Sequence, residues 1–451
     1  MKIGYKRLLT SSSILSAPGF ISIIISLLSI PVHLNFAGPE SYGNYIIFHF
    51  ILLFSINFNL GIGKSSAISI NNFPKNKKEI GYKAIQYTTN VALIILAIFL
   101  LLNILKKISF YNYNDFYEFT SFLIIGSIIT IYYITFEGIL QGNRKFTSIS
   151  IFNLFFFSLS FSVPSILLIF FKSLSLYNLI FISIIIKFFS ILIMFLIIKK
   201  NRLSIKAESK ILKINLKKNS KWITLNGVLV QFYDLFDKYL IKFFLGPIAL
   251  ASYSVPQQLT GKLSIISKSF SAFLLPDLSK KKINNLSFNF SLKIFLKIIP
   301  LFIFSLIPFY PFILELWLGN SYNETIHYLT KIFSLSIIFS CASHILTTKF
   351  EATKTLSRNL KFEFFLMPFF LIGLFYLTSG NYSLINLSIL ILIKELILFF
   401  LRLNFLKSEI KEINSYYLYS IYFILMLFLS FYNQNFFYLS IMLLFFNYFR
   451  K

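Results

Sequence analysis

The chain has 451 residues, of which 57% are apolar, whereas an ordinary soluble domain is roughly 45–50% apolar. This excess excludes a soluble globular protein. The 43 Lys and Arg against 16 Asp and Glu give a formal charge of +27, which a polytopic membrane protein carries in its cytoplasmic loops rather than on a nucleic-acid-binding surface. A membrane-spanning helix with its connection uses about 30 residues, so the length allows at most about fifteen spans.

Apolar runs bounded by Gly, Pro, Asn and charged residues predict fourteen membrane-spanning helices. The basic N-terminus leads into the first run without a cleavage site, so we expect a retained helix there. The last two runs are short, and a twelve-helix core with a C-terminal hairpin describes the same pattern. The predicted helices cover about 14–32, 44–70, 80–105, 117–139, 146–171, 175–198, 220–244, 248–275, 286–315, 323–348, 359–379, 383–406, 415–432 and 434–449.

The loops alternate in charge. Of the 33 Lys and Arg in predicted loops or at the adjoining helix ends, 30 lie on the side that holds both termini. Because basic residues resist translocation, this alternation predicts that both termini are cytoplasmic and supports the even number of helices.

The chain shows signs of an internal duplication. Gly38-Pro39 with Tyr45 recurs 208 residues later as Gly246-Pro247 with Tyr253, and Ser175-Leu176-Tyr177-Asn178-Leu179 matches Ser383-Leu384-Ile385-Asn386-Leu387 at the same offset. Six helices per half make the repeats parallel, with a cleft between them. We therefore expect an N-terminal six-helix lobe (1–198), a basic cytoplasmic linker (199–221), a C-terminal six-helix lobe (222–406) and a two-helix hairpin (407–451).

The sequence shows few of the residue patterns that are typical of an enzyme. It contains no glycine-rich phosphate loop of the Walker type, its four His are scattered without metal-ligand spacing, and it has one Cys. Loops on the side opposite the termini reach only about ten residues, which leaves little room for the catalytic loop of a membrane-embedded glycan polymerase or ligase. We expect neither cofactor nor metal, and a transporter rather than an enzyme.

Charges inside the predicted spans are the strongest candidates for function, because each costs about 2.5–3.5 kcal/mol at mid-helix on insertion scales. Helix 220–244 carries Asp234, Asp237, Lys238 and Lys242, three of which share one face at i, i+4 spacing. This pattern predicts either a charged wall of the central cleft, which we favour, or a structural ion pair with a neighbouring helix.

Five further residues extend this set. Lys64 follows two glycines that permit close backbone approach, and it has no acid nearby in sequence, so we expect it to attract an anionic ligand. Glu137, Lys262 and the pair Lys394-Glu395 are weaker candidates. Other cations within spans, including Lys242 and Lys268, can also snorkel towards an interface along their aliphatic stems.

Short motifs spread over nearly the whole chain resemble the polysaccharide flippases of the MOP exporter superfamily, which includes the O-antigen flippases and is related to the MATE exporters. The helix-7 motif of that family is Asp-Arg, where this chain has Asp237-Lys238, so the charge is kept without the bidentate fork of Arg. The matching pieces are Gly38-Pro39-Glu40-Ser41-Tyr42-Gly43-Asn44-Tyr45, Asn59-Leu60-Gly61-Ile62-Gly63, Glu137-Gly138-Ile139-Leu140-Gln141-Gly142, Lys221-Trp222-Ile223-Thr224, Gly246-Pro247, Tyr253-Ser254-Val255-Pro256, Leu275-Pro276 and Leu316-Trp317-Leu318-Gly319.

The resemblance implies an all-α, two-lobed transporter of the bacterial inner (cytoplasmic) membrane. Its implied substrate is a polyprenyl-pyrophosphate-linked oligosaccharide of O-antigen, lipopolysaccharide or capsule synthesis, flipped to the periplasmic leaflet. A polysaccharide polymerase and glycosyltransferases are the implied partners. We expect Lys64, Lys238, Lys262 and Lys242 to bind the anionic headgroup, with Asp234, Asp237 and Glu137 pairing with those cations or exchanging ions. The alternative is a MATE-like cation-coupled exporter of small molecules. Such an exporter would favour acids in its cleft, whereas cations outnumber acids in the predicted spans of this chain.

Overall fold

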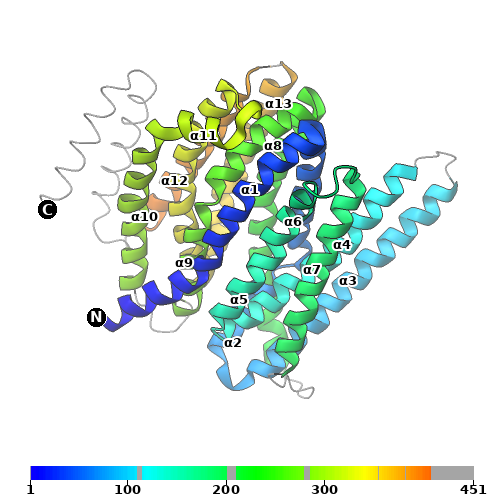
Figure 1. Ribbon diagram of the computed structural model, residues 1–451. Helices are drawn as coiled ribbons and strands as arrows, with labels where there is room; N and C mark the ends of the chain where they lie inside the picture. Colours follow the sequence, from blue (N-terminus) through cyan, green and yellow to red (C-terminus); the bar gives the residue numbers. More distant parts are fainter. Residues whose placement is uncertain are drawn as a thin grey trace, which may run out of the picture.

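The computed structural model describes residues 2–108, 114–200, 210–278, 285–353, 355–380 and 382–407. The described residues form helices joined by short turns, as the long apolar runs predict (Figure 1). Nine of these helical segments are long and apolar enough to cross a membrane. The hairpin predicted at 407–451 lies outside the described residues, apart from Lys407.

The first half of the chain provides seven α-helices. The long first helix α1 contains the first predicted span and the start of the second, because its break at Gly38 is only one residue wide. The elements are α1 (Lys2–Phe54), η1 (Ser55–Asn59), α2 (Ile62–Asn72), η2 (Pro74–Asn76), α3 (Lys77–Ile108), α4 (Asn114–Gly142), α5 (Phe146–Asn153), the π-helical turn η3 (Leu154–Leu159), α6 (Ser160–Leu167) and α7 (Leu176–Lys200).

The second half provides the other seven. Helix α8 begins within the predicted linker 199–221, so part of that linker is helical, and a turn at Gly261 divides the predicted helix 248–275. The elements are α8 (Lys210–Gly261), α9 (Ser264–Leu278), α10 (Asn285–Leu306), η4 (Ile307–Phe309), α11 (Tyr310–Leu318), η5 (Gly319–Ser321), α12 (Glu324–Ala352), α13 (Leu356–Ser379) and α14 (Leu384–Phe405).

The two matching Gly-Pro motifs adopt the same backbone conformation. Gly38 has φ 82° and ψ 163°, and Gly246 has φ 85° and ψ 172°. Side chains essentially exclude this region, so glycine is required at both positions. Each glycine interrupts a helix of more than 50 residues, and the two helices pack against each other, with Gly43 of α1 against Pro247 of α8. The duplication expected from the sequence therefore has a matching conformation in both halves.

The buried apolar side chains separate largely by half of the chain. One cluster draws all of its buried members from residues 45–198. Two others come mainly from residues 233–406, joined by a few side chains of α1 and α2 such as Ile30, Leu34 and Ile68. We call the two parts the N-terminal lobe and the C-terminal lobe, and α1 contributes to the cores of both.

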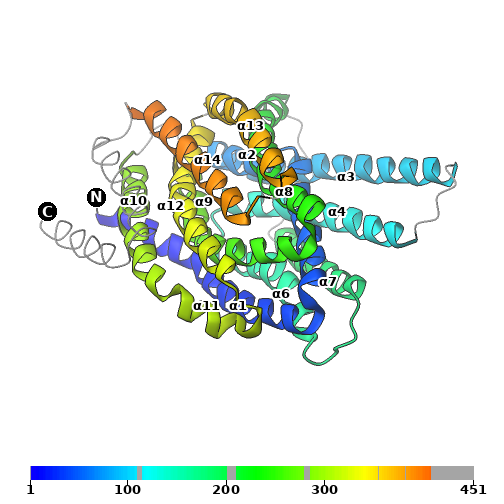
Figure 2. The ribbon, with the colours of Figure 1, turned by 90° about the horizontal axis from the view of Figure 1, so that it is seen from above.

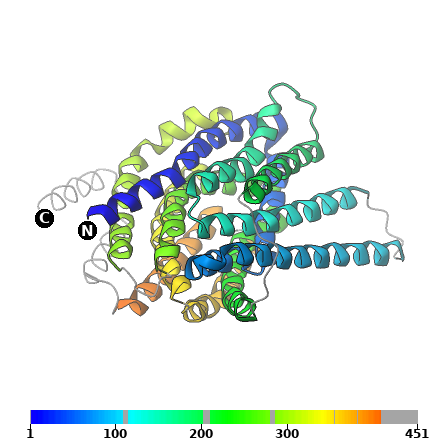
Figure 3. The ribbon, with the colours of Figure 1, turned by 90° about the horizontal axis from the view of Figure 1, so that it is seen from below.

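The figures show how the lobes are arranged. Viewed from above, α3 and α4 project together from the body on one side, while α12, α13 and α14 gather on another (Figure 2). Viewed from below, α1 lies along α10 and α11, which it also contacts (Figure 3). Helix α1 thus crosses from the N-terminal lobe onto the C-terminal one.

Close backbone approach fixes α2 against α4, as the glycines near Lys64 predict. A Cβ atom on Gly138 would lie 2.0 Å from the carbonyl oxygen of Gly63, and one on Gly63 would lie 2.4 Å from the carbonyl oxygen of Ile134. Neither backbone can yield without shifting a helix. This contact holds α2, and with it Lys64, in place.

Replacing Gly138 with Ala should therefore destabilise the protein by about 1–3 kcal/mol through overpacking, although the same change in an open helix stabilises by about 1 kcal/mol. Gly261→Ala is the matched control, because nothing lies within 4 Å of its added Cβ. Thermal unfolding in detergent measures both variants. Equal unfolding temperatures for the two would contradict the close approach of α2 and α4.

Candidate functional site

An ion pair joins the two lobes. The ammonium of Lys64 on α2 lies 2.6 Å from Oε1 of Glu351 on α12, although the two residues are 287 positions apart. Lys64 follows a left-handed turn at Leu60 and Gly61 that ends η1 and starts α2. Its side chain is 51% exposed and that of Glu351 only 6%. Lys64 therefore has a partner that its sequence neighbourhood does not reveal, and it keeps access to solvent or ligand.

Further charges surround this pair. Glu137 of α4 lies within electrostatic range of both Lys64 and Lys268, and Lys268 of α9 lies within range of Lys262 in the turn before it. His344 of α12 lies within range of Lys64 and Lys268 as well. The resulting group, which we call the central cluster, consists of Lys64, Glu137, Lys262, Lys268, His344 and Glu351.

The central cluster lies where the lobes meet. Lys64 and Glu137 come from the N-terminal lobe and the other members from the C-terminal lobe. Two hydrogen bonds cross the same interface: the Asn57 side-chain amide donates to Oε1 of Gln231 at 2.8 Å, and the Gln141 side-chain amide donates to the Ala272 carbonyl at 3.0 Å. A ligand bound between the lobes would therefore meet these charges.

The cluster is cationic on balance. Three lysines face two carboxylates, and one carboxylate is already held by Lys64. Ammonium groups in such a setting suit oxyanions, because charge-assisted hydrogen bonds to phosphate or carboxylate are short and strong. Since Lys64 is half-exposed and its ammonium has three hydrogen-bond donors, it can bind a ligand anion while it still holds the buried Glu351 carboxylate. The arrangement fits an anionic headgroup better than a cationic drug.

Glu137 has a partner of its own. The Asn153 side-chain amide donates to Glu137 Oε1 at 3.4 Å, and the Tyr133 hydroxyl donates to the other end of that amide. Asn153 ends α5 directly before the π-helical turn η3, and wide turns of this kind are often found at functional sites. The carboxylate is thus oriented within the N-terminal lobe rather than left mobile.

The charged residues of α8 do not together line a cleft, as the favoured interpretation expected. Two of them, Asp237 and Lys238, are buried. Lys238 is fully buried, and its ammonium lies 3.2 Å from Asp237 Oδ1, 2.6 Å from the Asp234 carbonyl oxygen and 4.1 Å from the centre of the Phe50 ring. Asp237 Oδ2 accepts a hydrogen bond of 2.8 Å from the Tyr253 hydroxyl. Asp237 and Lys238 therefore form a buried ion pair between adjacent residues of α8, rather than an ion pair with a neighbouring helix.

Asp234 and Lys242 complete the α8 stripe without joining the central cluster. The Asp234 side chain is exposed, and its backbone carbonyl, rather than its carboxylate, holds Lys238. Lys242 is half-buried one turn further along the helix. Of the seven predicted site residues, the structure brings Lys64, Lys262 and Glu137 together.

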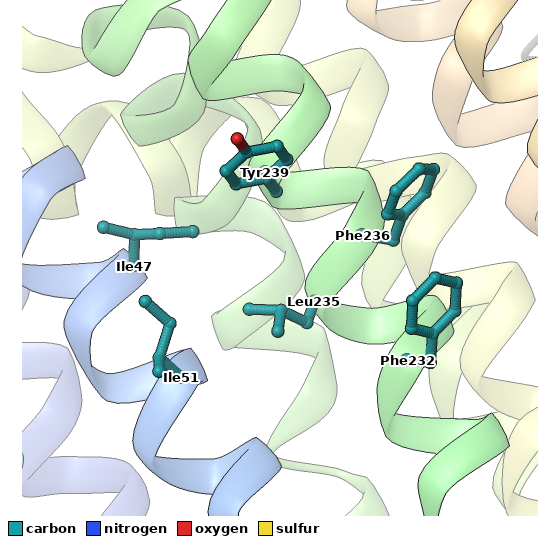
Figure 4. A pocket seen from close by; sticks show the side chains of 6 residues that line it. All are labelled: Ile47, Ile51, Phe232, Leu235, Phe236 and Tyr239. Atoms are coloured by element: carbon teal, nitrogen blue, oxygen red, sulfur yellow. The ribbon is translucent and has the colours of Figure 1, made fainter. Parts of the chain in front are cut away.

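An apolar groove runs beside these charges. Ile47 and Ile51 of α1 face Leu235 and Tyr239 of α8, and the rings of Phe232 and Phe236 stack at the other edge (Figure 4). All six side chains that line it are aliphatic or aromatic, and they come from α1 and α8. The groove therefore offers apolar surface between these two helices.

A second polar network fills the C-terminal lobe. Arg402 of α14 donates from Nη2 to Glu363 Oε1 and from Nε to Asn359 Oδ1 at 2.8 Å, and the Asn359 amide donates to Asn226 Oδ1 at 2.6 Å. Lys394 lies 3.0 Å from Glu395 and 4.6 Å from the centre of the Tyr233 ring. These bonds tie α8, α13 and α14 together.

Sequence reasoning missed several of these residues. Arg402 and Glu363 lie inside the predicted helices 383–406 and 359–379, so a cation and an acid within spans are the sequence signal for this pair. Lys268, for which snorkelling is one expectation, instead lies within electrostatic range of Glu137 and His344, and nothing in the sequence links Glu351 or His344 to Lys64. Among the described residues, no group of three His, Cys, Asp or Glu could hold a metal ion.

Comparison with known families agrees with this architecture. Residues 36–327 match the family model described as polysaccharide biosynthesis protein. The chain belongs to this family. No curated protein matches the sequence. The family expected from the sequence motifs is thereby confirmed.

Solved structures show the fold of this polysaccharide biosynthesis protein. An outward-facing multidrug resistance MATE transporter of the MOP superfamily is similar with a TM-score of 0.64 and 14% identity, over 90% of this chain and 96% of that one. A mutant MATE transporter of Vibrio cholerae gives 0.60 and 14%, over 90% and 100%. A MOP transporter of Pyrococcus furiosus gives 0.57 and 12%, over 90% and 98%. The protein thus has the fold of these MATE and MOP transporters, and nine of its described helical segments are long and apolar enough to cross a membrane.

Proposed function

We propose that this protein is a flippase that moves polyprenyl-pyrophosphate-linked oligosaccharide repeat units from the cytoplasmic to the periplasmic leaflet by alternating access. It would act in the bacterial inner membrane, with both termini cytoplasmic, in the synthesis of O-antigen or capsule. The observation that carries the proposal is the cationic central cluster, which lies between two lobes of a polysaccharide-family transporter.

The chemistry of such a substrate matches two neighbouring surfaces. The pyrophosphate suits Lys64, Lys262 and Lys268, which lie around the seam between the lobes. The polyprenyl chain is apolar and would stay in lipid, or along the apolar groove between α1 and α8. Glu137 and Glu351 would hold the lysines when no substrate is bound.

The remaining charges would have supporting roles. Asp237 and Lys238 fix α8 from inside the C-terminal lobe, and exposed Asp234 and half-buried Lys242 stand on the same helix at the edge of the interface. A polysaccharide polymerase and glycosyltransferases would act after and before translocation, as partners in the same pathway.

The lipid-linked glycan pool of a deletion strain tests the proposal. Polyprenyl-pyrophosphate species are extracted and identified by mass spectrometry, with and without the gene restored. We expect complete, unpolymerised repeat units to accumulate in the deletion strain and to disappear on complementation. A normal pool together with altered sensitivity to cationic drugs would instead favour a MATE-like exporter of small molecules.

A further inference from the structure

Prolines inside the helices leave backbone carbonyl groups without their helical donors. Proline has no N–H, so the carbonyl four residues before it loses the hydrogen bond that it would accept within the helix. In lipid such a carbonyl must find another donor from the protein. Three of these prolines are Pro31 of α1, Pro164 of α6 and Pro276 of α9, and the carbonyls that they free belong to Leu27, Ser160 and Ala272.

Two of the freed carbonyls lie against side chains of other helices. The indole of Trp317 on α11 donates to the carbonyl of Leu27. The Tyr45 hydroxyl of α1 donates to the Ser160 carbonyl at 3.5 Å and, more closely, to the neighbouring Phe161 carbonyl at 2.9 Å. A side chain from a distant part of the sequence therefore replaces the N–H that each proline lacks.

The third freed carbonyl joins the two lobes. Gln141 of α4, in the N-terminal lobe, donates from its side-chain amide to the Ala272 carbonyl of α9, in the C-terminal lobe, at 3.0 Å. The Ala272 side chain packs against the apolar cluster of the N-terminal lobe. Beside it, the ring of Phe273 lies 6.1 Å from the ring of Phe146 on α5. The end of α4 thus meets α9 across the seam between the lobes.

This bond lies one helical turn from charges of the central cluster. Gln141 follows Glu137 by four residues on α4, and Ala272 follows Lys268 by four residues on α9, so each pair shares a helix face. Glu137 and Lys268 lie within electrostatic range of each other. The end of α4 is also fixed in place, because a Cβ atom on Gly142 would lie 2.8 Å from a side chain of α2. The amide of Gln141 is therefore presented to α9 from a rigid helix end.

A bond to this carbonyl can open without disturbing α9. The Ala272 carbonyl accepts no bond from residue 276, so losing Gln141 breaks no turn of the helix. Ala272 and Gln141 are both half-buried, so water can take the place of the amide on the carbonyl and of the carbonyl on the amide. The contact is therefore suited to repeated opening and closing.

We propose that Gln141 and Pro276 form a latch that holds the lobes together beside the central cluster, with Gln141 as the donor and the proline providing a free acceptor. Gln141 is a positioning residue, because it acts on the lobes and not on the substrate. The inference rests on the alternating access of the proposed function, in which the lobes part where α4 meets α9. Two motifs of the sequence, the one that ends in Gln141-Gly142 and Leu275-Pro276, then serve one contact.

Alkylation of a cysteine at the seam measures the opening of the lobes in the purified full chain. Ile68 of α2 is 3% exposed and belongs to an apolar cluster of the C-terminal lobe, so Ile68→Cys reacts with N-ethylmaleimide when the lobes part. The single native cysteine, Cys341, is replaced by alanine in these proteins. Gln141→Leu and Gln141→Glu lack the amide donor, and we expect each to raise the alkylation rate about fivefold.

Pro276→Ala tests the acceptor. It gives residue 276 a backbone N–H that binds the Ala272 carbonyl within α9, so we expect it to raise the alkylation rate as the Gln141 variants do. Adding Gln141→Leu should then raise the rate no further than the larger of the two single changes. If the two effects multiply in the double variant, the bond does not depend on the proline and the proposal is overturned.

Two controls distinguish the latch from a general loosening of the fold. Tyr45→Phe removes the comparable bond inside the N-terminal lobe and should leave the alkylation rate of Ile68→Cys within about twofold. In proteins that keep Ile68, the buried native Cys341 reports on the core of the C-terminal lobe, and Gln141→Leu should not change its alkylation rate.

Unchanged alkylation of Ile68→Cys in both Gln141 variants would overturn the latch. An increase that Cys341 follows to the same extent would overturn it as well, because the core would then be loosened as a whole. No substrate is present in these measurements. An error in the proposed substrate would therefore appear in the lipid-linked glycan pool and not in the alkylation rates.

Discussion

Reversing one charge of the ion pair between Lys64 and Glu351 is expected to reduce glycan export at least about tenfold, and reversing both should restore part of it. Glu351→Lys would place a third cation beside Lys64 and Lys268, and Lys64→Glu would place a third acid beside Glu351 and Glu137. Like charges at an interface cost several kcal/mol. The double variant regenerates the pair with its direction exchanged.

Export is measured as surface glycan per cell in a complemented deletion strain, with the amount of protein in the membrane determined in parallel. Lys75→Glu reverses an exposed charge on η2 and is the matched control, expected to leave export within about twofold. If both single reversals export normally while present at wild-type amounts, the pair has no part in transport. If the double variant is no better than the singles, Lys64 is needed for the substrate itself.

Removing the guanidinium of Arg402 is expected to destabilise the protein by about 3–5 kcal/mol, because Glu363 would be left as a buried charge without a partner. Arg402 is 5% exposed and Glu363 1%. The substitution Arg402→Met preserves most of the volume of the side chain, so the loss would come from charge and hydrogen bonds rather than from a cavity. Asn359 would lose its bond to Arg402 Nε as well.

Combining Arg402→Met with Glu363→Leu should recover much of this loss, since neither charge then remains buried alone. Arg358→Met is the matched control, because Arg358 is exposed and its guanidinium lies over the face of Phe405, 5.1 Å from the centre of that ring. Thermal unfolding and the yield of monodisperse protein in detergent measure all three. An unfolding temperature for Arg402→Met equal to that of Arg358→Met would show that the network does not support the fold.

The fold was accessible from the sequence because its signals are local. Apolar runs, loop charges and the repeated Gly-Pro motifs each depend on residues close together in the chain, and Gly38 and Gly246 indeed share one conformation. The predicted helix boundaries were wrong where a short turn does not interrupt the apolar run. At Leu60 and Gly61, the break between η1 and α2 lies inside the predicted helix 44–70.

The site was less accessible because its partners come from distant helices. The sequence around Lys64 contains no acid, but its partner Glu351 lies 287 positions away. Neighbours in sequence therefore could not reveal this ion pair. The i, i+4 spacing of Asp234, Lys238 and Lys242 predicts that they share one face of a helix. It does not predict which of these side chains is buried. Lys238 turned out to be fully enclosed while Asp234 is exposed.

The position of α1 across both lobes has a consequence for biogenesis. The indole of Trp317 on α11 donates its hydrogen bond to the carbonyl of Leu27, and these residues are separated by 290 positions. At about 5–20 residues per second, the ribosome needs roughly 15–60 s after making Leu27 before Trp317 exists. During that interval Ile30 and Leu34 of the first helix, which belong to an apolar cluster formed mainly by the second lobe, are not yet covered by it. The final docking of this helix is therefore a late event of assembly.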